Sequence, residues 1–510
     1  MFQKSVRVAP LLVALCLAAC GKGDDNAPST QPDANPARGQ LSGTPTVAGT
    51  YSASDLLSML TTDPLGKELL QLTVSPTCSI TVYHMEYGTV GGAGEATTAS
   101  GALMVPSGSS ATCQGARPVV EYAHGTNASK VFNMANLPGN SEALLMATVF
   151  ASQGYIVVAP NYAGYDTSTL PYHPYLNAGQ QSKDMIDALA AARSAYSTAS
   201  ASDNGKVFIT GYSQGGHVAM ATHKAMQAAG MTVTAAAPMS GPYALAAFGD
   251  AIFEGEVNTS GPLNLDLVVT SYQHSYDNIY SAPTDVYETA YAATADELLP
   301  SATAISTIYA NGQLPENALF NSASPGAAYN AYTPATAPAN LAPIFALGFG
   351  TNDLITNTYR STYLQDATTN PDGGFPTTTT GVPAAAPTVG LRQDLKTNDL
   401  RNWAPTAPVL LCGGDSDPTV FYFNTQLMQA YWTTESSVSV TVIDVDSSPA
   451  ANDPYANEKN GFAAVKAAVA AAAVVGGATD GGAMAVLQDY HATLVPPFCL
   501  SAVKSFFDGY

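Results

Sequence analysis

The sequence predicts an α/β fold with a mostly parallel β-sheet, an N-terminal antiparallel hairpin and a large cap insertion. From Arg117 onward, strand-like apolar runs alternate with helix-like segments, which is typical of a parallel sheet covered by helices on both faces. Two earlier strand-like runs, residues 80–89 and 99–105, read as a hairpin. Residues 244–406 contain no convincing buried strand and are rich in Tyr, Pro, Thr and Ala, so we interpret them as a cap.

The first residues read as a targeting segment. Lys4 and Arg7 precede the apolar stretch 8–17, which is too short to cross a bilayer permanently. It ends in Leu17-Ala18-Ala19-Cys20, which resembles the bacterial lipoprotein box, where cleavage leaves a lipid-bearing cysteine. We therefore expect a signal peptide over residues 1–19 and a membrane anchor on Cys20, with an ordinary signal cut near Ala19 as the alternative. Gly21, in place of Asp, favours the outer membrane by the same resemblance, facing the periplasm or the cell exterior.

Composition sets the domain organisation and excludes some partners. Residues 20–50 have almost no large apolar side chain, so we expect a flexible tether. The rest fits one domain, residues 51–243 and 407–510, interrupted by the cap at 244–406. The formal net charge of -21 argues against nucleic acid and anionic lipid surfaces as partners, because like charges repel.

Four cysteines remain after Cys16 leaves with the signal and Cys20 takes lipid, and four cysteines allow three pairings. An oxidising compartment favours disulfides. In an antiparallel hairpin the start of one strand lies beside the end of the other, so the cysteines just outside the predicted hairpin can approach each other. We predict the bridges Cys78–Cys113 and Cys412–Cys499, with free buried thiols as the alternative.

The elements of the predicted sheet follow in order. The strands are expected at residues 118–123, 155–159, 206–210, 233–238, 408–412 and 438–445, and the helices at 141–151, 179–196, 463–475 and 495–507. The Ala-rich helix at 463–475 contains Lys466 and is too short to span a membrane.

The segment Gly211-Tyr212-Ser213-Gln214-Gly215 has the G-x-S-x-G form. It follows the apolar run 207–209 and opens a helix-like segment, which is the strand-turn-helix context that this motif requires. The tight turn exposes the hydroxyl of Ser213, a nucleophile that needs a base to take its proton.

Histidine is the expected base because its pKa lies near working pH. His491 comes after the last predicted strand, in a late loop, whereas the other six histidines lie on the hairpin, in earlier loops, in the cap or on the helix after Ser213. A carboxylate must then orient the imidazole. Asp415 and Asp417 follow the strand at 408–412, at the sheet edge where catalytic groups collect in such folds.

The order Ser213, Asp417, His491 resembles that of the α/β-hydrolase superfamily. Residues 414–420 are similar to the family's G-x-x-D-x-x-V turn, which selects Asp417 over Asp415. His124-Gly125-Thr126 is similar to the family's H-G-x loop, which implies an oxyanion hole made by the backbone N–H groups of Thr126 and Gln214. Residues 240–243 and 157–164 look like those of bacterial secreted esterases and lipases.

This resemblance implies a serine carboxylesterase or lipase acting on small-molecule or lipid esters, without cofactor or metal. The acidic turn at 444–446 lacks the spacing of a calcium loop. Cap tyrosines could line the pocket or simply pack; the candidates are Tyr272, Tyr276, Tyr280, Tyr287 and Tyr291. Two other functions stay open: a prolyl-oligopeptidase-like peptidase with the same triad, which commonly has a large propeller ahead of this domain, and a non-catalytic envelope binding lipoprotein on the same fold.

Overall fold

A computed structural model describes residues 35–70, 72, 75–372, 382–435 and 438–510. The predicted signal peptide and the lipid anchor on Cys20 lie outside these residues and stay predictions. Among the described helices, none is long and apolar enough to cross a membrane.

The described strands include a nine-stranded sheet of order β1-β2-β3-β5-β4-β6-β7-β10-β11. Its first three strands and β5 pair antiparallel, and from β5 to β11 every neighbouring pair is parallel. The bounds are β1 Thr46–Tyr51, β2 Ser79–Val90, β3 Ala96–Ser107, β4 Arg117–Ala123, β5 Ile156–Pro160, β6 Asp203–Tyr212, β7 Ala235–Met239, β10 Val409–Gly413 and β11 Val440–Asp444. The predicted mostly parallel sheet with an N-terminal hairpin is confirmed.

The predicted tether, residues 20–50, overlaps the folded domain. Strand β1 pairs with β2, and Arg38 forms an ion pair with Asp187 on the helix α4 (Ala178–Ala199). The sequence of β1 is rich in Gly and Thr, as a linker would be. An edge strand can leave most of its side chains exposed, and β1 does so. Residues 35–50 therefore belong to the fold.

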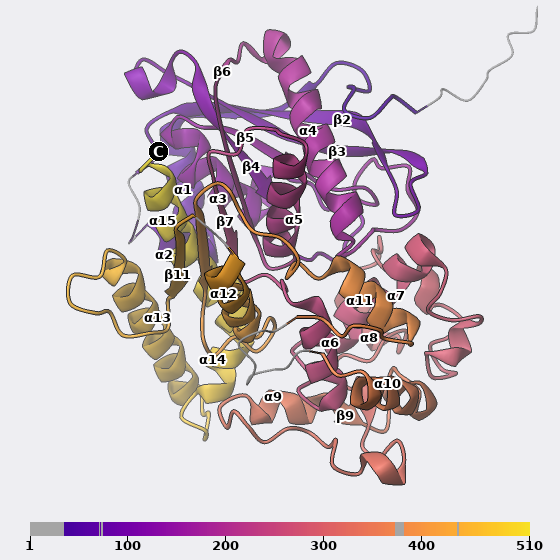
Figure 1. The fold of residues 1–510 in the computed structure, drawn as a ribbon. Helices are drawn as coiled ribbons and strands as arrows, with labels where there is room; N and C mark the ends of the chain where they lie inside the picture. The colour runs from indigo at the N-terminus through magenta and orange to yellow at the C-terminus, as the bar shows by residue number, and fades with distance from the viewer. Residues whose placement is uncertain (1–34, 71, 73–74, 373–381, 436–437) are drawn as a thin grey trace, which may run out of the picture. The chain divides into compact units, whose positions relative to one another are not determined.

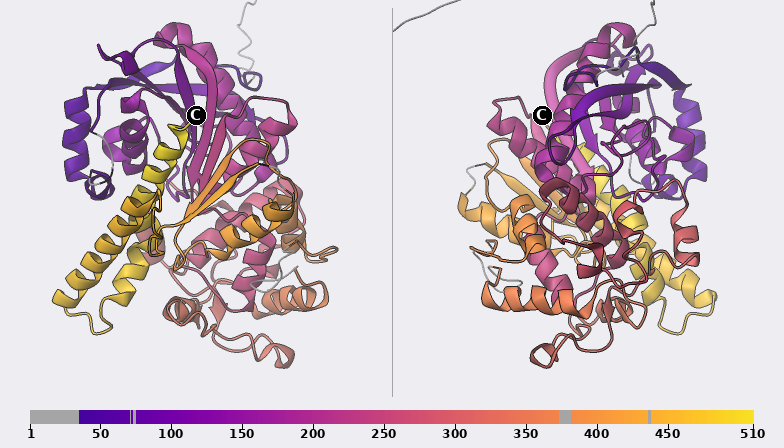
Figure 2. Two further views of the ribbon diagram at one scale, coloured as in Figure 1. Left: turned by 60° about the vertical axis from the view of Figure 1, so that its left-hand side comes forward. Right: turned by 90° about the vertical axis from the view of Figure 1, so that its right-hand side faces the viewer.

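Helices cover both faces of the sheet. One face carries α4 and α5 (Gln214–Ala228), which pack against each other (Figure 1). The other face carries α1 (Ala53–Thr62), α2 (Pro64–Leu69), α3 (Ser141–Val149) and α15 (Val495–Phe507). Helix α12 (Phe423–Glu435) packs on the last strands, and α13 (Ala456–Val475) lies beside α15 (Figure 2).

Between β7 and β10 the chain forms a layer of short helices, which lie together at the lower right of Figure 1. They are α6 (Leu245–Glu254), α7 (Gly261–Tyr276), α8 (Ile305–Ala310), α9 (Ala342–Leu347), α10 (Asn357–Thr369) and α11 (Gly390–Asn398), with the two-residue strands β8 (Phe320–Asn321) and β9 (Phe349–Gly350). This layer has its own apolar core. The cap insertion expected from the sequence is present.

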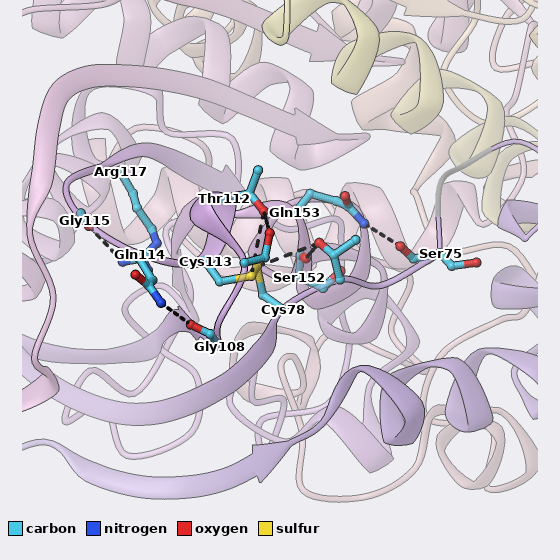
Figure 3. The surroundings of a disulfide bond; sticks show 12 residues. Ser75, Cys78, Gly108, Thr112, Cys113, Gln114, Gly115, Arg117, Ser152 and Gln153 are labelled. Carbon is cyan, nitrogen blue, oxygen red and sulfur yellow. Dashed lines mark hydrogen bonds between the residues drawn. A yellow bond between two sulfur atoms is a disulfide. The ribbon is translucent and has the colours of Figure 1, made fainter.

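Both predicted disulfides are confirmed. Cys78 bonds to Cys113, which follows the end of β3, and Cys412 in β10 bonds to Cys499 in α15. Ser79 pairs with Ser107 in the hairpin register, so Cys78 and Cys113 meet where the hairpin opens (Figure 3). The second bridge fixes α15, and with it the end of the chain, to the parallel sheet.

Candidate active site

Ser213 lies in the sharp turn between β6 and α5, which we call the elbow. Its backbone has φ 61° and ψ -122°, a conformation that non-glycine residues rarely adopt. A Cβ on Gly211 would overlap the Gly215 carbonyl, and a Cβ on Gly215 would overlap the Ala123 carbonyl of β4. The two glycines are therefore required by close backbone packing, which lifts the Ser213 side chain off the sheet.

The structure brings the three predicted catalytic residues together. Ser213 Oγ lies 2.8 Å from His491 Nε2, and His491 Nδ1 lies 2.6 Å from Asp417 Oδ2. The other carboxylate oxygen of Asp417 accepts the backbone N–H groups of Thr419 and Val420 at 2.9 and 3.0 Å. Asp417 is buried, so this held carboxylate fixes Nδ1 as the protonated ring nitrogen and leaves Nε2 free to accept the serine proton.

The predicted late loop around His491 is wrong. His491 lies in a π-helix, Tyr490–Leu494, that joins α14 (Ala483–Asp489) directly to α15. The proline pair Pro496-Pro497 begins α15 without ending the helical path, because proline is tolerated in a first helical turn. A π-helical turn is a recurrent feature of functional sites.

The predicted oxyanion loop lies next to the nucleophile. A Cβ on Gly125 would lie 3.7 Å from the Ser213 Cβ, so the loop after β4 touches the elbow. Among the described residues, the backbone N–H groups of Thr126 and Gln214 have no hydrogen-bond acceptor. Gln214 also begins α5, where the helix dipole favours negative charge. Both N–H groups are therefore available to an oxyanion.

Sequence reasoning missed the residues that hold this loop and the elbow. The buried His173 binds the Gln214 side chain, with His173 Nε2 lying 2.7 Å from Gln214 Nε2. Its Nδ1 lies 2.9 Å from the Ala163 carbonyl, to which it donates, and burial lowers its pKa to about 3. The imidazole is thus a neutral acceptor for the Gln214 amide. Two residues on, the Tyr175 hydroxyl lies 2.7 Å from Thr126 Oγ1.

Glu142, at the start of α3, is the third missed residue. Its Oε1 accepts the Gly125 N–H at 2.9 Å and the Tyr122 hydroxyl at 2.5 Å, and burial raises its pKa. The only signal in the sequence was its place in the first turn of a helix, where acids are common, and that gave no reason to pair it with Gly125.

Ser213 and His491 open into a cavity of about 620 Å³. Side chains from the helical layer form much of its lining and are mostly apolar: Leu245, Phe248, Ile252, Phe253, Leu263, Leu265, Val268, Ile305, Leu319, Leu391 and Leu395. The five cap tyrosines considered from the sequence do not line this cavity; they pack in or against the core of the helical layer. The tyrosines that do line it are Tyr122, Tyr175 and Tyr212.

Several other histidines and one acidic turn have partners of their own, away from Ser213. His84 pairs with Asp166, His217 binds the Asn398 carbonyl, and His274 stacks on Tyr172. In the acidic turn at 444–446, Asp446 pairs with Lys466 and accepts the Tyr490 hydroxyl. No group of three or more His, Cys, Asp or Glu residues in the described ranges could hold a metal ion.

Comparison with known proteins finds chains of the same fold. The Prolyl oligopeptidase family matches residues 142–281, which include the elbow. The solved structure of the rice cell wall degrading esterase LipA from Xanthomonas oryzae is 27% identical with a TM-score of 0.66, and the alignment covers 92% of this chain and 98% of that one. A candidate hydrolase from Legionella pneumophila shares the fold at 19% identity and a TM-score of 0.61, over 80% of this chain and 91% of that one. None of the curated proteins matches the chain.

The sheet order, the elbow and these similarities agree with one another. They support a serine hydrolase that acts on ester or peptide bonds. The chain is a member of the α/β-hydrolase superfamily.

Proposed function

We propose that the protein hydrolyses carboxylic esters, as an esterase or lipase, through an acyl-enzyme on Ser213. One observation carries the proposal: the hydrogen-bond chain from Asp417 through His491 to Ser213 ends inside a cavity with largely apolar walls. The chain supplies an activated hydroxyl, and the cavity supplies room for an acyl group.

The reaction follows from the positions of these groups. Ser213 Oγ attacks the ester carbonyl while His491 Nε2 takes its proton, and Asp417 stabilises the imidazolium that forms. The N–H groups of Thr126 and Gln214 donate to the carbonyl oxygen as it gains negative charge. His491 then protonates the departing alcohol, and a water molecule, deprotonated by the same imidazole, releases the acid from Ser213.

Two facts favour an ester over a peptide bond. The relative from Xanthomonas oryzae is an esterase, and it aligns with most of both chains. The helical wall of the cavity is rich in leucine and phenylalanine, which suits an acyl chain. The match to the Prolyl oligopeptidase family makes peptide cleavage the alternative.

The disulfides also bear on the compartment in which the protein functions. Two buried disulfides are typical of an oxidising compartment, which supports a protein that functions outside the cytoplasm. We propose that it does so as an envelope lipoprotein held by lipid on Cys20, which membrane fractionation of a Cys20→Ala variant would test.

The first experiment measures hydrolysis of p-nitrophenyl esters from acetyl to palmitoyl, and of a proline peptide anilide, by the purified protein. We expect ester hydrolysis, and a fall in kcat of about 10⁴ in Ser213→Ala, because the remaining site lacks a nucleophile. A fluorophosphonate should label the native protein and spare the variant.

Ser194→Ala is the matched control, because Ser194 is exposed on α4 and, among the described residues, its hydroxyl binds the Ala190 carbonyl alone. It should keep full activity. Ester hydrolysis that survives in Ser213→Ala would sink the proposal, and cleavage of the anilide alone would favour the peptidase.

A further inference from the structure

The backbone carbonyl of His491 has lost its helical donors. In a helix, the carbonyl of residue i accepts the N–H of residue i+4, or of i+5 in a π-helix. For His491 these residues are Val495 and Pro496. Val495 donates its N–H to the Tyr490 carbonyl, and proline has no N–H. Because His491 is buried, this carbonyl needs a donor from elsewhere.

Tyr212 supplies that donor. Its hydroxyl donates to the His491 carbonyl at 2.6 Å, from a side chain that is itself buried. The two rings also pack together, with centroids 5.1 Å apart. Burial raises the pKa of Tyr212 well above its ordinary value, so the phenol keeps the proton that it donates.

Ala492 shows why the bond is specific to His491. Its carbonyl faces the same loss, because residues i+4 and i+5 are Pro496 and Pro497. Ala492 is exposed, however, so water can satisfy its carbonyl. Of these two neighbouring carbonyls, the one on the buried base is the one bound by Tyr212.

We propose that Tyr212 is a positioning residue, which fixes the imidazole of His491 by holding its backbone. Tyr212 is the residue immediately before Ser213, at the end of β6. One phenol therefore connects the strand that carries the nucleophile to the helical turn that carries the base, two segments 279 residues apart in the chain. This role rests on the proposed function, since it acts on proton transfer between Ser213 and His491.

The test is Tyr212→Phe, which removes the hydroxyl and keeps the ring. With the carbonyl unpaired, the π-helical turn shifts to find another donor and the distance from Nε2 to Oγ changes. A displacement of about 1 Å in a catalytic group costs up to about 100-fold in rate. We expect kcat to fall by about 10- to 100-fold with KM within about twofold, and fluorophosphonate labelling of Ser213 to slow in parallel.

A rescue separates this role from a general loss of stability. Pro496→Ala restores an N–H at position i+5 of His491, so the double variant Tyr212→Phe/Pro496→Ala should recover several-fold in kcat relative to Tyr212→Phe. Pro497→Ala restores an N–H that reaches Ala492 instead and should give no recovery. Tyr155→Phe is the phenol control, because its hydroxyl binds Asp508 at the end of the chain, and it should keep the native kcat.

The outcomes distinguish the two proposals. A native protein that neither hydrolyses esters nor reacts with the fluorophosphonate would overturn the proposed function and this inference with it. An active native protein whose Tyr212→Phe variant keeps its kcat, or is rescued equally by both proline substitutions, would overturn the inference alone.

Discussion

The two walls of the cavity are built by different means. On the sheet side, each reacting group is held by hydrogen bonds: Asp417 by two backbone N–H groups, His491 by Asp417 and Tyr212, and Gln214 by His173. On the side of the helical layer, the lining is mostly leucine, isoleucine, valine and phenylalanine held by apolar packing. The groups on the sheet side can transfer protons, whereas the apolar residues of the helical layer can only select substrates by size and shape.

Two buried ionisable groups of the molecule are held in different ways. In the helical layer, Arg392 donates to Asp250 at 2.7 and 2.9 Å and to Asp366 at 2.9 Å, so its charge is fully paired. In the sheet, Glu121 of β4 is completely buried, and neither carboxyl oxygen has a hydrogen-bond partner among the described residues. Arg392 is thus a buried ion with full pairing, whereas Glu121, like Asp266 in α7, is a buried carboxyl that is stable only when neutral.

The largest effect predicted from this comparison is on the sheet side. Asp417→Asn should lower kcat by about 10³- to 10⁴-fold, because an amide can stabilise the wrong imidazole tautomer and cannot balance the imidazolium charge. Steady-state hydrolysis of p-nitrophenyl butyrate measures it. KM should change little, since Asp417 lies behind His491 as seen from Ser213.

Asp415→Asn is the matched control for this substitution. Asp415 lies two residues earlier in the same turn, but it is exposed, and its backbone N–H binds Asp444. Its loss should leave kcat within about twofold. Equal losses in the two variants would mean that the turn as a whole, and not one carboxylate, supports the base.

Much of the sheet side of the cavity could be predicted, because short stretches of the sequence determine its structure. The glycines around Ser213 have no room for a side chain, and the position of an acid after a strand places it at the carboxyl edge of the sheet. Order along the chain then selected His491. The hairpin register placed Cys78 beside Cys113 for the same reason: short-range patterns determine strand pairing.

The rest depends on contacts between distant segments. Tyr212 and His491, His173 and Gln214, and Tyr175 and Thr126 meet only after folding, and nothing near any of them in the sequence marks its partner. The turn at His491 was predicted as a loop, but the two prolines that follow it lie in the first turn of α15 and do not interrupt the helical path. The lining of the helical layer was unpredictable in the same way, since leucines there pack the core and line the cavity alike.

A second prediction tests the helical wall. Leu265 on α7 is half-buried and lines the cavity, so Leu265→Trp should shorten the space for an acyl chain. Each methylene kept out of an apolar site costs about 0.8 kcal/mol, so excluding two lowers kcat/KM roughly tenfold. We expect this loss for long-chain p-nitrophenyl esters and an unchanged rate for the acetyl ester.

Leu347 provides the control, because it is exposed on α9 in the same layer. Leu347→Trp should leave the chain-length profile as it is. If Leu265→Trp lowers the acetyl and long-chain rates by the same factor, the helical wall affects the chemistry and the division between the two walls is wrong.

The smallest effect concerns stability and not catalysis. Burial raises the pKa of Glu121 from 4.5 to about 8 in the folded protein. A carboxyl whose folded pKa is raised stabilises the fold fully below its unfolded pKa, and that stability is lost as the pH rises from about 4.5 to about 8. The free energy of unfolding should therefore fall across this window by roughly a few kcal/mol.

Glu121→Gln removes the ionisation and keeps the shape. We expect its Tm to match that of the native protein near pH 5 and to exceed it at pH 9, in thermal melts at constant ionic strength. Glu316→Gln, at an exposed position, should follow the native protein at both values. A Tm difference between Glu121→Gln and the native protein that stays constant with pH would mean that Glu121 is ionised in the fold, and that its charge is compensated as that of Arg392 is.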